Sequence, residues 1–368
     1  MTSEAATRPQ RSGAGVLVRR ALLLATAVVA LTGVLAGLAR IGVGVAWGPS
    51  YAFAHGPLMT VGVFGTVIAL ERAVALARPW ALAAPLTGSI AAFASLCGFG
   101  WASWAATLSS ALLLAVNAAI VGRQMAAFTW LMLAGSVVLL AGNLGWAAGR
   151  PLFEVVPAWM GFFVLTITAE RLELSRLAPT SPWATRILVV LSAIFALLAC
   201  ASAAGIALPD SALGTAMAAL ALWQLRFDLA RRTVRLEGLP RFAAVGVLLG
   251  ASWLLATGVF LAATGVMVPA GPLYDAVLHG VFVGYVLSMV FAHAPIILPA
   301  VARVRVPFHA VLYVPLASLH ASLLLRVAGD LLPSAPMREA GAVGNALSIA
   351  MFAIAVLYAR RAAGADSA

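Results

Sequence analysis

The stretch His55–Arg78, HGPLMTVGVFGTVIALERAVALAR, decides the fold, because it predicts one long apolar helix. A helix of about 20 apolar residues crosses the hydrocarbon core of a bilayer. A second stretch, Leu278–Ala300, LHGVFVGYVLSMVFAHAPIILPA, has the same character and also carries His-Gly near its start. Ionisable side chains are costly in hydrocarbon, so histidines inside such spans are candidate functional residues.

The composition predicts a polytopic membrane protein. Of its 368 residues, 63% are hydrophobic and 10% charged, whereas soluble domains are about a quarter charged. All 23 basic residues are arginine and lie mainly between apolar runs. The net charge of +11 therefore reflects membrane topology, and a nucleic-acid partner is excluded. Cys97 and Cys200 lie in apolar runs without metal-finger spacing, which indicates small core residues.

Apolar runs separated by Arg, Pro and Gly predict an all-α fold of twelve transmembrane helices. The expected spans are 20–46, 52–77, 82–101, 104–122, 126–148, 152–174, 184–205, 211–228, 241–266, 274–300, 307–328 and 339–361. They form one membrane domain, residues 20–361. Residues 1–19 are expected to be a disordered cytoplasmic tail, and residues 362–368 a second short tail.

The distribution of arginine predicts the orientation. With the N-terminus inside, nineteen arginines fall on the cytoplasmic side and four on the outer side. The outer four are Arg40, Arg150, Arg326 and Arg338. This positive-inside bias predicts an inner (plasma) membrane protein with both termini in the cytoplasm.

A faint internal repeat predicts a pseudo-threefold arrangement of four-helix units. The pair Glu71-Arg72 near the inner end of helix 2 recurs as Glu170-Arg171 in helix 6. The His-Gly dipeptide at the outer start of helix 2 recurs in helix 10. These three helices are spaced four apart, as expected for a threefold repeat.

His55 and His279 are expected at one depth, each about one turn from the outer end of its helix. Imidazole ligates haem iron and transition metals, and two at one depth can bind opposite faces of one iron. Glycine beside each histidine would let a planar group approach. The alternative is two unrelated interfacial histidines that reach water. His320, about two turns from the outer end of helix 11, is a third candidate ligand or a hydrogen-bonded neighbour.

Two arginines are expected beside a haem at this level. Arg40 and Arg326 lie near the outer ends of helices 1 and 11. The planar guanidinium pairs carboxylates at two points, so both are candidates to bind haem propionates. The alternative is that both are ordinary interfacial arginines.

A second polar level is expected near the inner surface. Glu71 and His293 share that depth, and Glu170 is the repeat counterpart of Glu71. These residues are candidates for a proton path or a quinone-facing pocket. The alternative is an ion pair of Glu71 with Arg72 or Arg171.

The helix count and the histidines of helices 2 and 10 resemble the central subunit of haem-copper oxidases. The resemblance implies that His55 and His279 bind a low-spin haem and that Arg326 binds a propionate. Helix 10 lacks the His-x-His that would add a second haem ligand, and helices 6 and 7 lack histidine for copper. An oxygen-reducing binuclear centre is therefore not expected.

The chain is also similar to NnrS-type proteins, which are twelve-helix haem- and copper-containing membrane proteins linked to nitric oxide stress. The run HAPIILPAV, residues 293–301, and the histidines of helices 2 and 10 support this resemblance. The paired histidines of that family near the start of helix 2 are reduced here to His55 alone. Copper is therefore not expected.

We therefore expect an integral membrane protein that binds one bis-histidine haem b near the outer face. Its role would be redox or related to nitric oxide or another gas, with a quinone or another electron-transfer partner. The alternative is a secondary transporter that uses Glu71, Glu170 and His293, although no pair of broken helices marks inverted halves. A membrane enzyme acting on lipid or quinone would need a nucleophile and base, and no such constellation is present in the sequence.

Overall fold

The computed structural model describes residues 13–44, 49–177, 181–265, 267 and 269–365. Within these residues every regular element is a helix, which confirms an all-α membrane protein. The helices are α1 Gly13–Arg40, α2 His55–Pro57, α3 Thr66–Leu76, α4 Ala83–Leu96, α5 Ala102–Arg123, α6 Ala127–Ala147, α7 Leu152–Leu174, α8 Pro182–Ala203, α9 Asp210–Phe227, α10 Ala230–Thr233, α11 Leu239–Thr264, α12 Pro272–His279, α13 Ser288–Ala302, α14 Tyr313–Leu331 and α15 Ala335–Ala365.

Each of the twelve predicted spans overlaps a helix or a continuous helical run. Among the described residues, eleven of these are long and apolar enough to cross a membrane. The remaining one is α9, which is 18 residues long and carries Asp210, Gln224 and Arg226. It packs along α11, where Gly214 and Gly258 let the two backbones touch.

The first helix differs from its predicted bounds of 20–46. It starts at Gly13 and continues through Arg19 and Arg20, because arginine is a good helix former. It ends at Arg40, just before Gly42, whose φ of 88° breaks the helix. The predicted tail overlaps this helix at residues 13–19, and residues 1–12 lie outside the described part of the chain.

α7 is the most buried of the membrane-length helices in the described part of the chain. Trp159, Phe162 and Phe163 on this helix are among the largest fully buried side chains of the described residues. α1 is peripheral by contrast, and Leu24 and Leu31 on it are more than 60% exposed. Exposed leucines on a peripheral helix are what a lipid-facing surface requires.

The helices that carry His55 and His279 share a rare backbone feature. α2 passes into a π-helix, η2 (Leu58–Gly65), before α3, and α12 passes into a π-helix, η5 (Gly280–Leu287), before α13. Each π-helix is eight residues long and begins within three residues of its histidine. π-helical turns inside α-helices are rare and are frequently found at functional sites.

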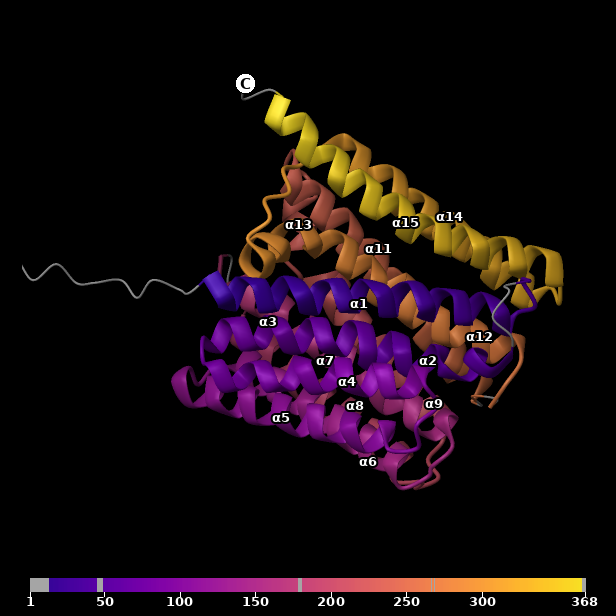
Figure 1. Cartoon of the computed structure of the whole chain (residues 1–368). Coiled ribbons are helices and arrows are strands. Elements are labelled where there is room, and N and C mark those ends of the chain that lie inside the picture. The colour runs from indigo at the N-terminus through magenta and orange to yellow at the C-terminus, as the bar shows by residue number, and fades with distance from the viewer. Residues whose placement is uncertain (1–12, 45–48, 178–180, 266, 268, 366–368) are drawn as a thin grey trace, which may run out of the picture.

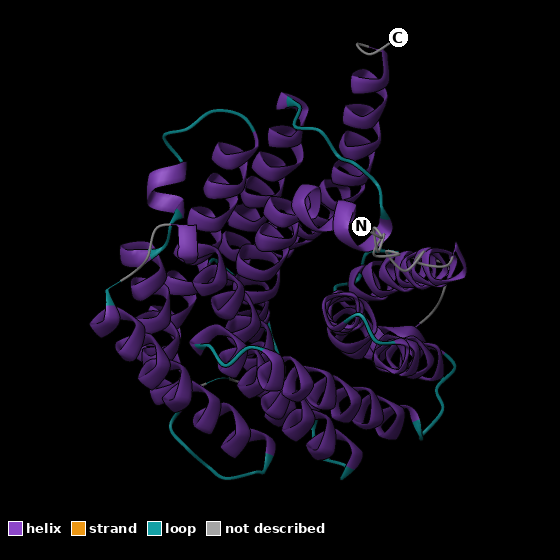
Figure 2. Ribbon diagram, turned by 90° about the vertical axis from the view of Figure 1, so that its left-hand side faces the viewer, coloured by secondary structure: helices purple, strands orange, loops and turns teal. Residues whose placement is uncertain are grey.

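The start of α1 and the end of α15 point to the same side of the bundle, and α12 lies at the other side (Figure 1). Seen along the bundle, the helices enclose a central region rather than forming a flat layer (Figure 2). We call the side that carries Arg40, His55 and His279 the histidine end, and the other side the opposite end.

Candidate functional site

His55 and His279 face each other at the histidine end. Their ring centroids are 6.2 Å apart, and their planes differ by 21°. The two residues are 224 positions apart in the chain and come from α2 and α12. The two histidines, which were expected at one depth in the membrane, therefore also lie next to each other.

Backbone carbonyls fix the orientation of both rings. His55 Nδ1 lies 2.7 Å from the carbonyl oxygen of Gly33 on α1. His279 Nδ1 lies 2.9 Å from the carbonyl oxygen of Asp275, one turn earlier on α12. A carbonyl oxygen only accepts, so each Nδ1 carries a proton, and in the neutral imidazole each Nε2 keeps its lone pair. This tautomer is the one that metal-binding histidines adopt when a second group orients them.

The rings are stacked, and the distance between their centres is by itself compatible with one metal ion bound to a nitrogen of each. A metal bonded to one nitrogen of each ring at about 2.0–2.1 Å places the two ring centres roughly 6.3 Å apart. The observed 6.2 Å is close to this value. Among the described residues, no group of three or more His, Cys, Asp or Glu side chains could hold a metal ion. A cofactor that brings its own equatorial ligands, as haem does, needs only the two imidazoles.

Glycines on α1 leave room for the His55 ring and bind it through a backbone carbonyl. A Cβ atom on Gly37 would lie 2.6 Å from Cε1 of His55, so only glycine leaves room for the imidazole. Gly33, one turn earlier, supplies the carbonyl for Nδ1 and would clash with Met59 if it carried a side chain. The spacing Gly33-x-x-x-Gly37 is the small-residue pattern of close membrane helix pairs.

The two His-Gly glycines have different roles. A Cβ atom on Gly56 would meet nothing within 4 Å, and Gly56 lines the cavity beside the histidines. The space that a planar group would need beside His55 is therefore present at Gly56. Gly280 instead packs against Thr257 of α11, so this glycine serves helix packing.

A cavity of about 760 Å³ lies beside the histidine pair. Typical binding pockets for small molecules and cofactors measure about 300–1,000 Å³. Phe64, Trp159 and Phe282 are aromatic residues of its walls. Phe163 packs edge-on against both Phe64 and Phe282 at 5.8 and 5.9 Å, so the aromatic wall is held from behind. An apolar, aromatic wall of this kind suits a flat organic group.

Three arginines line the same cavity, namely Arg40, Arg326 and Arg338. Arg326 is engaged by Asp275, to which its Nε and Nη2 donate at 2.7 and 2.8 Å. The Asp275 carboxylate in turn lies 3.1 Å from Nδ1 of His279. Arg326 thus acts on the histidine through Asp275, while exposed Arg40 and part-exposed Arg338 lie nearer to solvent.

His320 lies outside the residues that line this cavity. Its Nδ1 accepts from Nε1 of Trp253 at 3.0 Å, and its Nε2 lies 3.3 Å from Oγ of Ser288. Both ring nitrogens are therefore engaged by neighbouring helices. This geometry matches the hydrogen-bonding alternative and gives no support to a third ligand.

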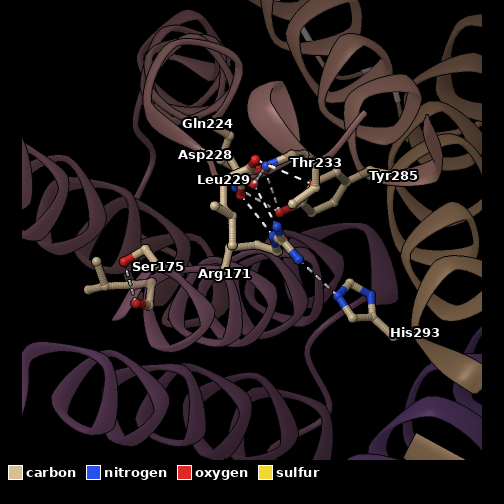
Figure 3. A network of polar contacts seen from close by, with 10 residues as sticks. Arg171, Ser175, Gln224, Asp228, Leu229, Thr233, Tyr285 and His293 are labelled. Carbon is tan, nitrogen blue, oxygen red and sulfur yellow. Dashed lines mark hydrogen bonds and ion pairs between the residues drawn. The ribbon is translucent and has the colours of Figure 1, made fainter. Parts of the chain in front are cut away.

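At the opposite end, a buried network surrounds Arg171 (Figure 3). Its Nε and Nη2 donate to Asp228 at 2.8 and 2.6 Å, and its Nη1 lies 3.2 Å from Nε2 of His293. His293 Nδ1 donates to the carbonyl of Met289 at 2.8 Å. Every polar atom of His293 has a partner, so the residue joins α7 to α13 rather than presenting a free nitrogen.

Glu71 and Glu170 converge on one arginine. Arg72 bonds Glu71, and its Nη2 lies 3.8 Å from Glu170. The expected ion pair of Glu71 is thus made with Arg72. His293 bonds Arg171 instead, so the three predicted polar-path residues belong to two groups, Glu71 and Glu170 around Arg72 and His293 beside Arg171.

Several residues of the histidine end were not predicted. Gly33 and Gly37 carry a recognisable small-x-x-x-small signal, and Asp275 stands one helical turn before His279. These spacings could have identified them. Asn345 carries no local signal, because its contacts lie 23 and 26 positions away.

The fold and this site define a polytopic helical membrane protein with a paired-histidine cavity at one end. A family model described as a domain of unknown function (DUF8744) matches residues 19–361. The chain therefore belongs to the DUF8744 family. No curated protein matches the chain.

Proposed function

We propose that this protein binds one b-type haem between His55 and His279 and serves electron transfer or a reaction of nitric oxide or another gas. The observation that carries the proposal is the histidine pair, with ring centres 6.2 Å apart and each Nδ1 bonded to a backbone carbonyl. The cavity beside the pair and its aromatic wall support the same conclusion. The proposed relationship to NnrS-type proteins agrees with it.

His55 and His279 would be the two axial ligands, and the haem would supply one-electron redox chemistry at its iron. Arg40 and Arg338, which line the cavity and lie nearer to solvent, would pair with the propionates. Arg326, which the sequence predicted for that role, would instead hold Asp275 against His279. We place the histidine end at the outer face of the plasma membrane, as the arginine bias predicts.

The test is the visible spectrum of the protein purified from haem-replete cells. Two imidazole ligands should give a Soret band and sharp reduced bands that carbon monoxide does not change. His55→Ala and His279→Ala should each lose the haem or open the iron to carbon monoxide. His309→Ala is the control, because His309 caps the short helix η6 (Ala310–Leu312) through Val311 and does not line the cavity.

A protein with no Soret band, either as purified or after reconstitution with haem, would contradict the proposal. A His309→Ala spectrum as altered as that of His55→Ala would place the iron elsewhere. If no Soret band is found, the hypothesis to test next is the transporter, which depends on Glu71, Glu170 and His293.

A further inference from the structure

The connection between α9 and α11, at the opposite end of the bundle, is strongly basic. We call residues 226–241 the basic connection. Its exposed arginines are Arg226, Arg231, Arg232, Arg235 and Arg241. Of the two acids in the segment, Asp228 is buried and bound by Arg171, and Glu237 is exposed. The surface of the segment therefore presents five positive charges against one negative charge.

The backbone of the basic connection is held by the buried network of Arg171 (Figure 3). Oδ1 of Asp228 accepts from the backbone N–H of Ala230, the first residue of α10, at 2.7 Å, and it also accepts from Nη2 of Arg171 at 2.6 Å. Nη1 of Arg231 donates to the carbonyl oxygen of Arg226 at 2.9 Å. The arginines are therefore presented from a backbone that the protein fixes in place.

The positive charges of the basic connection are not neutralised by the protein. Within the described residues, none of the ion pairs includes one of the five arginines. Like charges held close together repel, so an anion that binds among them is attracted by all of them. The planar guanidinium group pairs with a phosphate at two points. A ligand with a phosphate group therefore fits this surface.

Aromatic neighbours indicate that the basic connection lies at the membrane surface. The guanidinium of Arg226 lies 5.0 Å from the ring centre of Phe227, and Trp183 packs edge-on against the same ring at 5.3 Å. Trp183 is 56% exposed, and exposed tryptophan is enriched where the hydrocarbon core meets water. Arg241 stands in the first turn of α11, which is long and apolar enough to cross a membrane. The guanidinium groups therefore lie at the depth of lipid phosphates.

We propose that the basic connection binds the headgroups of anionic phospholipids in the leaflet at the opposite end of the bundle. Basic segments next to a transmembrane helix attract anionic lipids in this way. A zwitterionic headgroup offers the same phosphate together with an ammonium group, which the arginines repel, so the site selects anionic lipids. Leu236 is 52% exposed among the arginines and adds an apolar contact to the lipid. The site is separate from the proposed haem, which lies at the histidine end.

The test compares two lipids that have the same fluorescent acyl chains. Phosphatidylglycerol and phosphatidylcholine are titrated into the full-length protein in micelles of an uncharged detergent. The wild-type protein should bind phosphatidylglycerol roughly 10-fold more tightly, because each arginine beside an anionic headgroup strengthens binding about fivefold. Arg232→Gln combined with Arg235→Gln should remove most of this preference. Both side chains are exposed, so the double variant should fold.

Arg78→Gln combined with Arg360→Gln is the matched control. Both arginines are exposed at the same end of the bundle, and their replacement removes the same amount of charge. Arg78 directly precedes the short helix η3 (Pro79–Leu82), and Arg360 lies near the end of α15. Neither belongs to the basic connection, so this variant should keep the preference for phosphatidylglycerol.

Equal affinity of the wild-type protein for both lipids would overturn the proposed lipid site. A preference that survives in the Arg232/Arg235 variant would overturn it as well. An equal loss in the two double variants would assign the preference to the net charge of the protein. Displacement of phosphatidylglycerol by an equal concentration of glycerol phosphate would assign the surface to a soluble phosphate compound. The presence or absence of a Soret band changes none of these outcomes.

Discussion

At the scale of single residues, the two histidines are placed in unlike electrostatic surroundings. His55 donates to the neutral carbonyl of Gly33, whereas Nδ1 of His279 also lies 3.1 Å from a carboxylate oxygen of Asp275. A carboxylate near the N–H makes imidazole a stronger donor to a metal. Arg326 donates one hydrogen bond to each oxygen of that carboxylate, and these two bonds fix the orientation of the carboxylate toward His279.

Asp275→Asn should therefore raise the midpoint potential of the proposed haem, since the oxidised iron loses electron donation from His279. We expect the midpoint potential to shift by an amount on the order of 60 mV, which for a one-electron couple is a tenfold change in the equilibrium constant of reduction. Redox titration followed at the reduced visible bands measures it. Glu154→Gln is the control, because Glu154 lies at the same end but pairs with exposed Arg150. Equal shifts in both variants would assign the effect to net charge alone.

At the scale of helices, close packing at glycine decides where the side chains of the site can lie. α1 approaches α2 and η2 through Gly33 and Gly37, and this contact presses the His55 ring between the helices. On the other side of the site, Gly284 of η5 packs against the indole of Trp253. Small residues allow such contacts in lipid, where no hydrophobic force drives helices together.

Gly37→Ala should displace His55 and weaken haem binding while the protein still inserts. The added Cβ would lie 2.6 Å from the imidazole, and overpacking of this kind costs about 1–3 kcal/mol. Haem content per protein, from the Soret band and total protein, measures the loss. Gly15→Ala lies on the same helix with nothing within 4 Å of an added Cβ and should bind normally. Full haem content in Gly37→Ala would contradict this account of how His55 is held.

At the scale of the whole molecule, the bundle has two polar ends with different chemistry. The histidine end carries the cavity with its three arginines, and the opposite end carries the buried network of Arg171 and the pair Arg72–Glu71. α1 starts and α15 ends at the same side, as an even number of crossings requires (Figure 1). The proposed haem would lie at the histidine end, and the buried ion pairs stabilise the opposite end.

Reporter fusions test the orientation of the bundle. Fusions after Arg78, Arg176, Arg241 and Arg361 should all report the cytoplasm, because the arginine bias places these sites inside. Fusions after Arg150 and Pro333, at the alternate helix connections, should report the outer side. A cytoplasmic signal from either of these last two would move the histidine end to the inner face.

The sequence alone was sufficient for the membrane class and for a helix at each of the twelve predicted positions. Hydropathy is a local property, and a span of about 20 apolar residues in lipid has to satisfy its own backbone as a helix. Depth along a helix follows from residue count, so the common level of His55 and His279 was also predictable. His55 and its counterpart His279 could therefore be identified as a pair from the sequence alone.

Lateral contacts were decided only by the tertiary structure. The sequence offered Arg326 as a propionate partner and did not predict its pairing with Asp275, which lies on another helix, 51 positions away. His293 was expected at the level of Glu71, and the structure adds its lateral partner, Arg171, which is itself held by Asp228 from the connection after α9. Hydropathy gives the depth of a residue but not the direction in which it points around the helix axis. That direction follows from which helices pack together, and it determines the partners of every buried charge.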